Sequence, residues 1–337
     1  MQQPAAPSDA AQRHPLRAVA IIATVIIGVV LVALVGINAF VRVAYNPFYD
    51  QATREFPIPG VSEGFVPQDL DYLDAADEWL FSGYMAADLP SPVYKRAANG
   101  SVARLSVELP DGSAYRGHGS AITSTDRFVF LAREQGCLVL DAAEVAKAQD
   151  GATVRAVGSV GMDFSPAFMN IEGDVLYAGN FYFPGDYETP AHHHITTADG
   201  TENPAILYAY PADEGGTFGF AEKAERAYSI PGLVQGVAVT PDGQMVLSTS
   251  YGLRSSHLLA YDMAALAPEG TFAADGQTVP LYALDGRALV DDVEAPPMTE
   301  GIESHGGRVY IAEESASGKY LFGRLYGTGY VYAIDLR

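Results

Sequence analysis

The first long pattern in the chain is an uninterrupted apolar run. Residues 18–41 carry no charge, and Thr24 and Asn38 are the only clearly polar members. As an α-helix these 24 residues extend roughly 36 Å, enough to cross a bilayer core about 30 Å thick. A cleaved signal peptide is the alternative, but its apolar region is usually shorter, and no small-x-small cleavage signal follows cleanly here. The run therefore predicts a transmembrane helix over 18–41 that remains as a signal-anchor.

Basic residues flank this run unequally. Arg13 and Arg17 precede it, whereas Arg42 is the only basic residue close behind it. Because Lys and Arg concentrate on the cytoplasmic side of a span, we expect residues 1–17 to form a cytoplasmic tail. Residues 42–53 would then be a short stalk, and 54–337 an extracytoplasmic domain of a single-pass protein of the cell membrane.

Beyond residue 53 the pattern changes to short strands. Segments of about 4–8 apolar or aromatic residues alternate with turns rich in Gly, Pro, Asp and Asn. These strands recur in sets that open at positions 68, 118, 167, 235 and 300. The outermost strands of the second and fourth sets are expected at 154–160 and 279–284.

Two heptapeptides resemble each other across 172 residues. Residues 54–60 read REFPIPG and residues 226–232 read RAYSIPG. Self-similarity in an all-β chain is typical of radial repeats, so we predict a β-propeller. The fifth set lacks an outer strand, and residues 54–58 would supply it, which closes the ring and removes an open edge.

Five blades are favoured, with six or seven as alternatives. The openings lie 50, 49, 68 and 65 residues apart, whereas a blade usually takes about 40–45 residues. The longer intervals require insertions, and 183–203 and 264–277 have the composition of long loops without strand periodicity. A pair of β-sandwiches would also use many short strands, but it does not explain the twin heptapeptides.

The amino-acid composition limits which classes of partner the protein can bind. The chain has 41 acidic residues against 20 Lys and Arg, a net charge of −21, which disfavours binding of nucleic acid. The surface would attract cations or cationic partners, although a solvated acidic coat is the plainer interpretation. Cys137 is the single cysteine, so an intrachain disulfide is excluded, and its apolar surroundings are typical of a buried strand.

The openings of propeller blades face the central channel, so polar residues there are predicted to share one site. The predicted ligand-binding residues are Gln68, Asp69, His118, Phe168, Gln235, Tyr251, Glu300 and Glu303. Converging amides, carboxylates and an imidazole beside aromatic rings are typical of a ligand pocket, and Glu300 and His118 are the candidates for catalysis. The alternative is that these groups bond backbone amides or buried waters in a narrow channel.

Other clusters are weaker signals. His192, His193 and His194 suit zinc by residue type, but neighbouring histidines face one ion only across a sharp bend. Calcium is a further possibility at the channel carboxylates Glu300, Glu303 and Asp69. The serines and His257 around 248–257 lack a G-x-S-x-G elbow, so turn chemistry accounts for them.

Residues 65–70, FVPQDL, followed by WLFSGY at 79–84, resemble the opening blade of the five-bladed glutaminyl cyclotransferases, which carry a Phe-x-x-Gln-Gly-Leu motif. Gln235-Gly236 and Glu300-Gly301 resemble the same opening. Asp69 stands where that family has glycine, and Trp79 is the only tryptophan, whereas the family walls its pocket with tryptophans. The resemblance implies a five-bladed fold and, if the activity is shared, proton transfer by Glu300 during cyclisation.

Two functions follow from these patterns. The first is a membrane-anchored module that binds a small ligand or an extracytoplasmic protein, peptide or glycan. The second is a propeller enzyme of the cyclotransferase, lyase or lactonase kind that uses the polar groups at the channel mouth. The fold itself is compatible with both.

Overall fold

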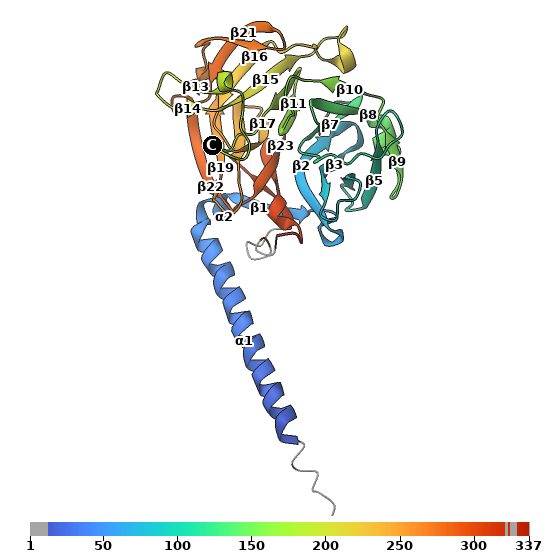
Figure 1. Cartoon of the computed structure of the whole chain (residues 1–337), viewed down its shortest axis with the longest axis vertical. Coiled ribbons are helices and arrows are strands. Elements are labelled where there is room, and N and C mark those ends of the chain that lie inside the picture. The colour runs from blue at the N-terminus through green and yellow to red at the C-terminus, as the bar shows by residue number, and fades with distance from the viewer. Residues whose placement is uncertain (1–12, 321–322, 324–328, 337) are drawn as a thin grey trace, which may run out of the picture.

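The structure, a computed structural model, describes residues 13–320, 323 and 329–336. The expected cytoplasmic tail, 1–17, therefore lies largely outside the described residues. Within them, five sheets surround a common centre, and a long helix extends from their edge (Figure 1).

Each of the five sheets is one blade, and its strands are named from the innermost outward. Blade 1 consists of β2 (Phe65–Leu73), β3 (Glu78–Met85), β4 (Pro92–Ala97), β5 (Val102–Glu108) and β9 (Thr153–Arg155). Blade 2 consists of β6 (Ile122–Ser124), β7 (Phe128–Arg133), β8 (Gly136–Asp141) and β10 (Gly158–Gly161). Blade 3 consists of β11 (Phe168–Glu172), β12 (Val175–Gly179), β15 (Ala205–Pro211), β16 (Arg226–Ile230), β21 (Gln277–Ala283) and β20 (Gly270–Ala274).

Blades 4 and 5 complete the ring. Blade 4 consists of β17 (Val234–Val239), β18 (Gln244–Thr249), β19 (Ser256–Asp262) and β22 (Leu289–Ala295). Blade 5 consists of β23 (Thr299–His305), β24 (Arg308–Glu313), β25 (Tyr330–Ile334) and β1 (Ala52–Pro57). The innermost strands contact each other in the closed order β2, β6, β11, β17, β23 and back to β2. The predicted five-bladed β-propeller is thereby confirmed.

The ring closes through the strand that follows the long helix. β1 pairs antiparallel with β25, and Phe56 lies opposite Val331. The Phe56 ring then contacts Trp79 and Phe81 of blade 1, with ring centroids 5.7 and 6.4 Å apart. The pairing expected for 54–58 is present, with the strand beginning two residues earlier and ending at Pro57.

Apolar side chains fill the space between neighbouring blades. Leu80 and Leu105 of blade 1 pack with Val129 and Leu138 of blade 2 in one such layer. The strands read as near-continuous apolar runs because a blade inside the ring is covered on both faces. Cys137 of β8 is fully buried, and burial raises the pKa of its thiol to about 12, so the thiol is unreactive at neutral pH.

Two outer strands differ from the sequence prediction. Residues 154–160 do not form one strand: β9 pairs parallel with β5 of blade 1, and β10 pairs with β8 of blade 2. The expected strand 279–284 belongs to blade 3, where β21 pairs parallel with β16. The outer strand of blade 4 is β22, which reads LVDDVEA. Its acidic side chains face solvent, so a search for apolar runs misses it.

The two expected loops contain more structure than predicted. Residues 264–277 include β20, which forms a hairpin with β21. Residues 183–203 include a short helical turn, Ala191–His193, and the hairpin of β13 (Ile195–Thr196) with β14 (Glu202–Asn203). The expected short helix is α3 (Ala142–Lys147), which Asp141 caps by accepting from the backbone N–H of Glu144 at 2.9 Å.

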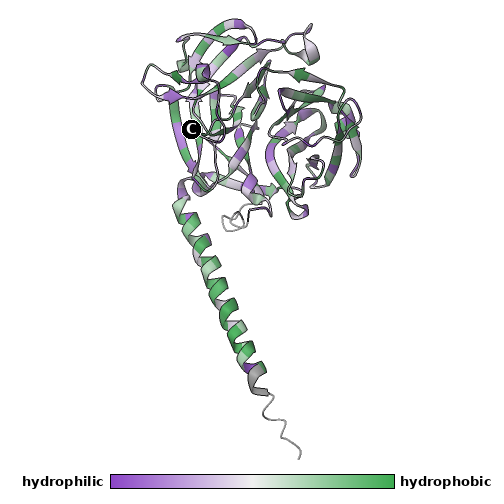
Figure 2. Cartoon of the chain, viewed as in Figure 1, coloured by the Kyte–Doolittle hydropathy of each residue, from purple (hydrophilic) through white to green (hydrophobic). Residues whose placement is uncertain are grey.

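The N-terminal helix α1 runs over Arg13–Ala44, and its segment Leu16–Ala44 is long and apolar enough to cross a membrane. Figure 2 shows apolar residues along almost its whole length. Most of the expected stalk is folded, because α2 (Asn46–Gln51) follows after Tyr45. Phe48 of α2 is fully buried between blades 4 and 5, and its ring centroid lies 5.7 Å from that of Tyr332.

Candidate functional site

A cavity of about 480 Å³ opens where the innermost strands begin, and all five blades contribute to it. Every blade contributes residues at or near the start of its innermost strand, and every blade except blade 2 also contributes residues near or after the end of its second strand. The lining residues are Gln68, Tyr84, His118, Ser120, Ala167, Phe181, Tyr187, Gln235, Tyr251, Gly252, Met298, Glu300, Glu314, Lys319 and Tyr320. We call this cavity the mouth pocket.

Five of the eight predicted ligand-binding residues line the mouth pocket. They are Gln68, His118, Gln235, Tyr251 and Glu300. The other three lie elsewhere: Asp69 and Glu303 are buried deeper in the channel, and Phe168 is fully buried in the layer between blades 3 and 4. The structure thus brings together the two catalytic candidates, Glu300 and His118.

Glu300 forms the acidic floor of the mouth pocket. Only 4 % of its surface is accessible, and Gln235 Nε2 donates to its Oε1 at 3.4 Å. Burial raises the pKa of Glu300 well above its ordinary range, and the charge of Glu314 and a hydrogen bond between the two carboxyl groups act in the same direction. The environment therefore favours the protonated form of Glu300 beside a second carboxyl group.

Glu314 connects this floor to the rim. Its Oε1 accepts from the hydroxyl groups of Tyr320 at 2.7 Å and Tyr84 at 3.2 Å. Lys319 donates to the Tyr84 hydroxyl, and its Nζ lies 4.8 Å from the centre of the Tyr84 ring. Glu314 and Lys319 are thus opposite charges joined through one phenol group.

His118 also packs against Tyr84. The two rings are stacked with centroids 4.5 Å apart. His118 keeps accessible surface at the mouth, yet the surrounding protein lowers its pKa by disfavouring the charged form, and the Lys319 charge lowers it further, against an opposite effect of Glu314. A neutral imidazole can accept a proton from, or donate a hydrogen bond to, a bound molecule.

An aromatic wall from blades 3 and 4 stands across the channel from Tyr84. Tyr251 stacks on Phe183 with ring centroids 3.9 Å apart, and it also contacts Phe181 and Tyr187. The Tyr251 hydroxyl donates to Asp186 at 3.1 Å, which fixes the ring in place. Tyr187 is 55 % exposed, so a large part of this wall is available to a ligand.

Steric crowding explains why glycine follows Gln235 and Glu300. A Cβ on Gly301 would lie 2.3 Å from the Cα of Asp69, and a Cβ on Gly236 would lie 2.5 Å from the carbonyl oxygen of Glu300. Neighbouring innermost strands approach so closely here that no side chain fits. Asp69 replaces the glycine in blade 1, and its carboxylate occupies the space beside Gly301.

Below the mouth pocket, buried carboxyl groups join neighbouring blades. Asp69 accepts from the backbone N–H groups of Leu70 and Ile122, both at 2.9 Å, and so connects blade 1 to the start of blade 2. Glu303 accepts from Asn170 Nδ2 at 2.7 Å across blades 5 and 3. Burial raises the pKa of both carboxyl groups well above the ordinary range, and that of Asp71 to about 7. The contacts of Asp69 with backbone N–H groups are of the kind that the structural alternative describes, whereas Glu303 bonds to a side-chain amide.

The three adjacent histidines have different polar and aromatic partners. His193 is buried and its Nδ1 lies 2.9 Å from Asn180 Nδ2, His194 Nε2 lies 3.0 Å from the Thr189 hydroxyl, and His192 stacks on Phe272. Among the described residues, no group of three or more His, Cys, Asp or Glu is arranged to hold a metal ion. A zinc or calcium site therefore stays a prediction without geometric support.

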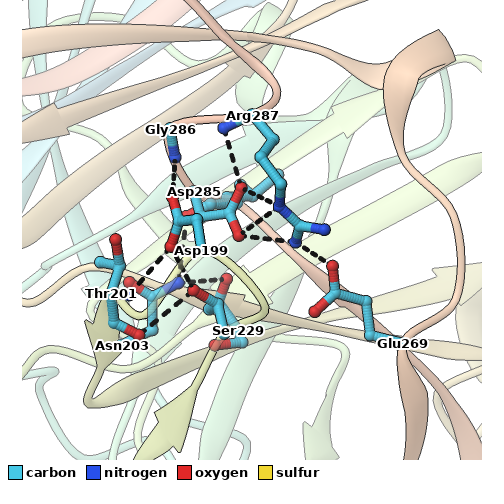
Figure 3. Close-up of polar contacts among 10 residues, drawn as sticks. Asp199, Thr201, Asn203, Ser229, Glu269, Asp285, Gly286 and Arg287 are labelled. Carbon is cyan, nitrogen blue, oxygen red and sulfur yellow. Dashed lines mark hydrogen bonds and ion pairs between the residues drawn. The ribbon is translucent and has the colours of Figure 1, made fainter.

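A second cavity, about 580 Å³, lies at the outer junction of blades 3 and 4. Figure 3 shows its polar side, where Asp199 accepts from the backbone N–H of Gly286 and Arg287 pairs with both Asp285 and Glu269. Asn203 donates to the carbonyl oxygens of Ser229 and Leu284, each at 3.0 Å. The contacts of Asp199 and Asn203 fasten the β13–β14 hairpin to the propeller, and Arg287 is paired with two carboxylates.

Part of the lining of the mouth pocket was not predicted from the sequence. Glu314, Lys319 and Tyr320 lie in the connection between β24 and β25, which has no strand pattern. Phe181 follows β12 directly and carried no signal beyond its aromatic type. The available signal was positional: these residues follow the second strand of a blade, as Tyr251 does, and Tyr84 lies at the end of such a strand.

No family model matches the chain, and no curated protein is similar to it. Among solved structures, similarity extends to the glutaminyl cyclase of Myxococcus xanthus (TM-score 0.41, 12 % identity, 85 % of this chain and 95 % of that one). A PQQ-bound aldose sugar dehydrogenase from Streptomyces coelicolor gives a TM-score of 0.42 at 12 % identity, covering 85 % and 98 %. Kuenenia stuttgartiensis hydrazine synthase gives 0.37 at 11 % identity over 74 % of this chain, which spans only 55 % of that protein. At this distance no activity carries over, and the conclusion rests on the topology: the chain is a five-bladed β-propeller.

Proposed function

We propose that the protein is a membrane-anchored extracytoplasmic propeller whose mouth pocket binds a small polar ligand. The observation that carries the proposal is the make-up of this pocket. Its polar floor is built from buried Glu300 and two glutamines, while its rim presents aromatic rings that are partly uncovered. Preformed pockets with a few converging polar groups and apolar walls are the usual form of small-molecule sites.

The N-terminal helix supports the anchoring. Its segment Leu16–Ala44 is apolar, and the most apolar part of it is not buried against the propeller. This exposure is what a helix surrounded by lipid requires. α1 leaves the edge of the disc near β22 and β1 (Figure 1), and none of its described residues lines the mouth pocket. Burial of Phe48 in α2 and the 3.3 Å hydrogen bond between Tyr45 and Ser255 hold the propeller close to the end of the helix.

An enzyme is the second candidate, and one observation favours it. Glu300 and Glu314 are two carboxyl groups in hydrogen-bond contact, and the pKa of Glu300 is raised. Such a pair can hold a single shared proton and serve as acid and base in turn. This chemistry suits a cyclotransferase, lyase or lactonase, in which one proton is taken from and returned to the substrate.

Thermal unfolding of the full chain in lipid nanodiscs tests the proposal. The panel contains divalent metal ions, neutral sugars and peptides with an N-terminal glutamine. We expect at least one class to raise Tm, and Glu300→Gln and His118→Ala to remove that shift. Leu253→Ala is the matched control, because Leu253 is exposed beside Tyr251 and does not line the mouth pocket. Shifts that persist in both pocket variants, or no shift with any compound, would contradict the proposal.

A further inference from the structure

We propose that the ligand of the mouth pocket is a neutral pyranose ring, as a free sugar or as the end of a glycan. This inference rests on the proposed function and names its ligand class. Three features of the pocket point to such a ring: an aromatic wall, a facing set of hydrogen-bonding groups, and the balance of charge.

The aromatic wall is preorganised for a ring with an apolar face. Tyr251 is held between its stacking contact with Phe183 and its hydrogen bond to Asp186. Tyr187 stands beside it, edge-on to Phe181 at 5.3 Å, and keeps 55 % of its surface exposed. Aromatic side chains of this kind offer large contact area with little loss of conformational freedom, and the C–H face of a pyranose can lie against them.

The opposite side of the pocket suits hydroxyl groups. Gln68 Nε2 donates to the Pro67 carbonyl oxygen at 3.1 Å and Gln235 Nε2 donates to Glu300, so each amide oxygen remains an acceptor for a ligand. The neutral imidazole of His118 can donate or accept, and the carboxylate of Glu314 can accept. A ring that carries hydroxyl groups around its edge satisfies donors and acceptors together, whereas an apolar ring would leave them unpaired.

The charges favour an uncharged ligand. Glu314 and Lys319 are the ionic groups of the lining, and they offset each other through Tyr84. Glu300 and His118 are both held toward their neutral forms. An anionic ligand would meet Glu314, and a cationic one would meet Lys319, in a partly desolvated pocket where an unpaired charge is expensive. A neutral ring meets neither penalty.

Calorimetric titration of the full chain tests this inference. The chain is held in lipid nanodiscs, because the headgroups of maltoside detergents are themselves sugar rings. The probes are glucose, galactose and N-acetylglucosamine, their β-1,4-linked tetramers, and the charged analogues glucuronate and glucosamine. We expect saturable binding of at least one neutral probe, and about tenfold weaker binding of its charged analogue. A tetramer that binds better than its monomer identifies a glycan end as the source, and equal affinity identifies a free sugar.

Variants locate the binding. Tyr187→Ala should weaken the binding of the neutral probe about tenfold, because it removes the most exposed ring of the aromatic wall on which the ligand would lie. Leu253→Ala, in the neighbouring loop, should leave binding unchanged. If no neutral sugar binds while another compound raises Tm through Glu300 and His118, the sugar assignment is wrong and the binding function stands. If no compound acts through these residues, both are wrong.

Discussion

Phe56 of β1 lies opposite Val331 of β25, near the other end of the chain. Through this pairing the segment that follows the N-terminal helices α1 and α2 becomes the outer strand of the last blade. The Phe56 ring also contacts Trp79 and Phe81 of blade 1. This one side chain therefore connects the last blade of the ring to the first.

Phe56→Ala should lower the free energy of unfolding by about 3 kcal/mol, because it removes a buried ring at the closure. Urea unfolding can be followed by the fluorescence of Trp79, the single tryptophan, which contacts Phe56. Val102→Ala serves as the control, since Val102 is 46 % exposed. Equal effects of the two substitutions would mean that the closure contributes no special stability.

Gly301→Ala should destabilise the propeller by about 2 kcal/mol, within the range for overpacked cores. Its Cβ would lie 2.3 Å from the backbone of Asp69, so β23 and β2 would have to separate. Gly161→Ala is the matched control, because a Cβ there would meet no atom within 4 Å. Thermal unfolding of both variants measures the difference, and a similar Tm for both would contradict the steric argument.

The Glu313→Gln variant should lose less of its free energy of unfolding than the wild type as the pH rises. Both carboxyl oxygens of Glu313 are buried without a hydrogen-bond partner in the described part of the chain, and burial raises its pKa well above the ordinary value of 4.5. Above pH 4.5 the unfolded chain releases this proton while the folded chain keeps it, so stability falls as pH rises toward the folded pKa.

Below pH 4.5 Glu313 is protonated in both the folded and the unfolded chain, so its titration does not lower the stability there. Above it, the stability difference between wild type and Glu313→Gln should change by up to about 1.4 kcal/mol per pH unit, to the advantage of the variant. Urea unfolding at pH 4, 5.5 and 7 checks this, with the exposed Glu214→Gln as control. A difference that does not vary with pH would show that Glu313 is ionised in the folded protein.

The proposed topology predicts where introduced cysteines react. Cys137 is fully buried, so the wild-type chain should give little background with a membrane-impermeant maleimide. In intact cells the reagent should label Glu214→Cys, on the exposed surface of the propeller, and should label Ser8→Cys only after permeabilisation. Labelling of Ser8→Cys alone in intact cells would reverse the orientation, and release of the protein by carbonate washing would exclude the anchor.

Much of the fold could be predicted from local patterns in the sequence. The apolar run before Arg42, the recurring strands and the twin heptapeptides at 54–60 and 226–232 predict a helix, a propeller and its closing strand. These features depend on periodicity and on local similarity, which a single chain displays. The outer strand β22 was missed because Asp291, Asp292 and Glu294 make it read as a loop.

Only about half of the candidate site could be predicted from the sequence in the same way. Gln68, Gln235 and Glu300 stand at equivalent positions of their blades, so a repeat pattern leads to them. Glu314 and Lys319 come from a connection without such a pattern, and their role appears only when blades 5 and 1 are placed side by side.

By itself, the amino-acid sequence determined the apolar helix, the all-β repeat and the residue types at the start of each blade, because these follow from neighbours along the chain. Tertiary structure alone decided which carboxyl groups enter the mouth pocket and which join blades beneath it. Asp69 and Glu300 both stand at the start of an innermost strand, yet a backbone N–H group of blade 2 engages Asp69, while Glu300 lies among pocket groups. That difference arises from contacts between blades, which sequence spacing does not encode.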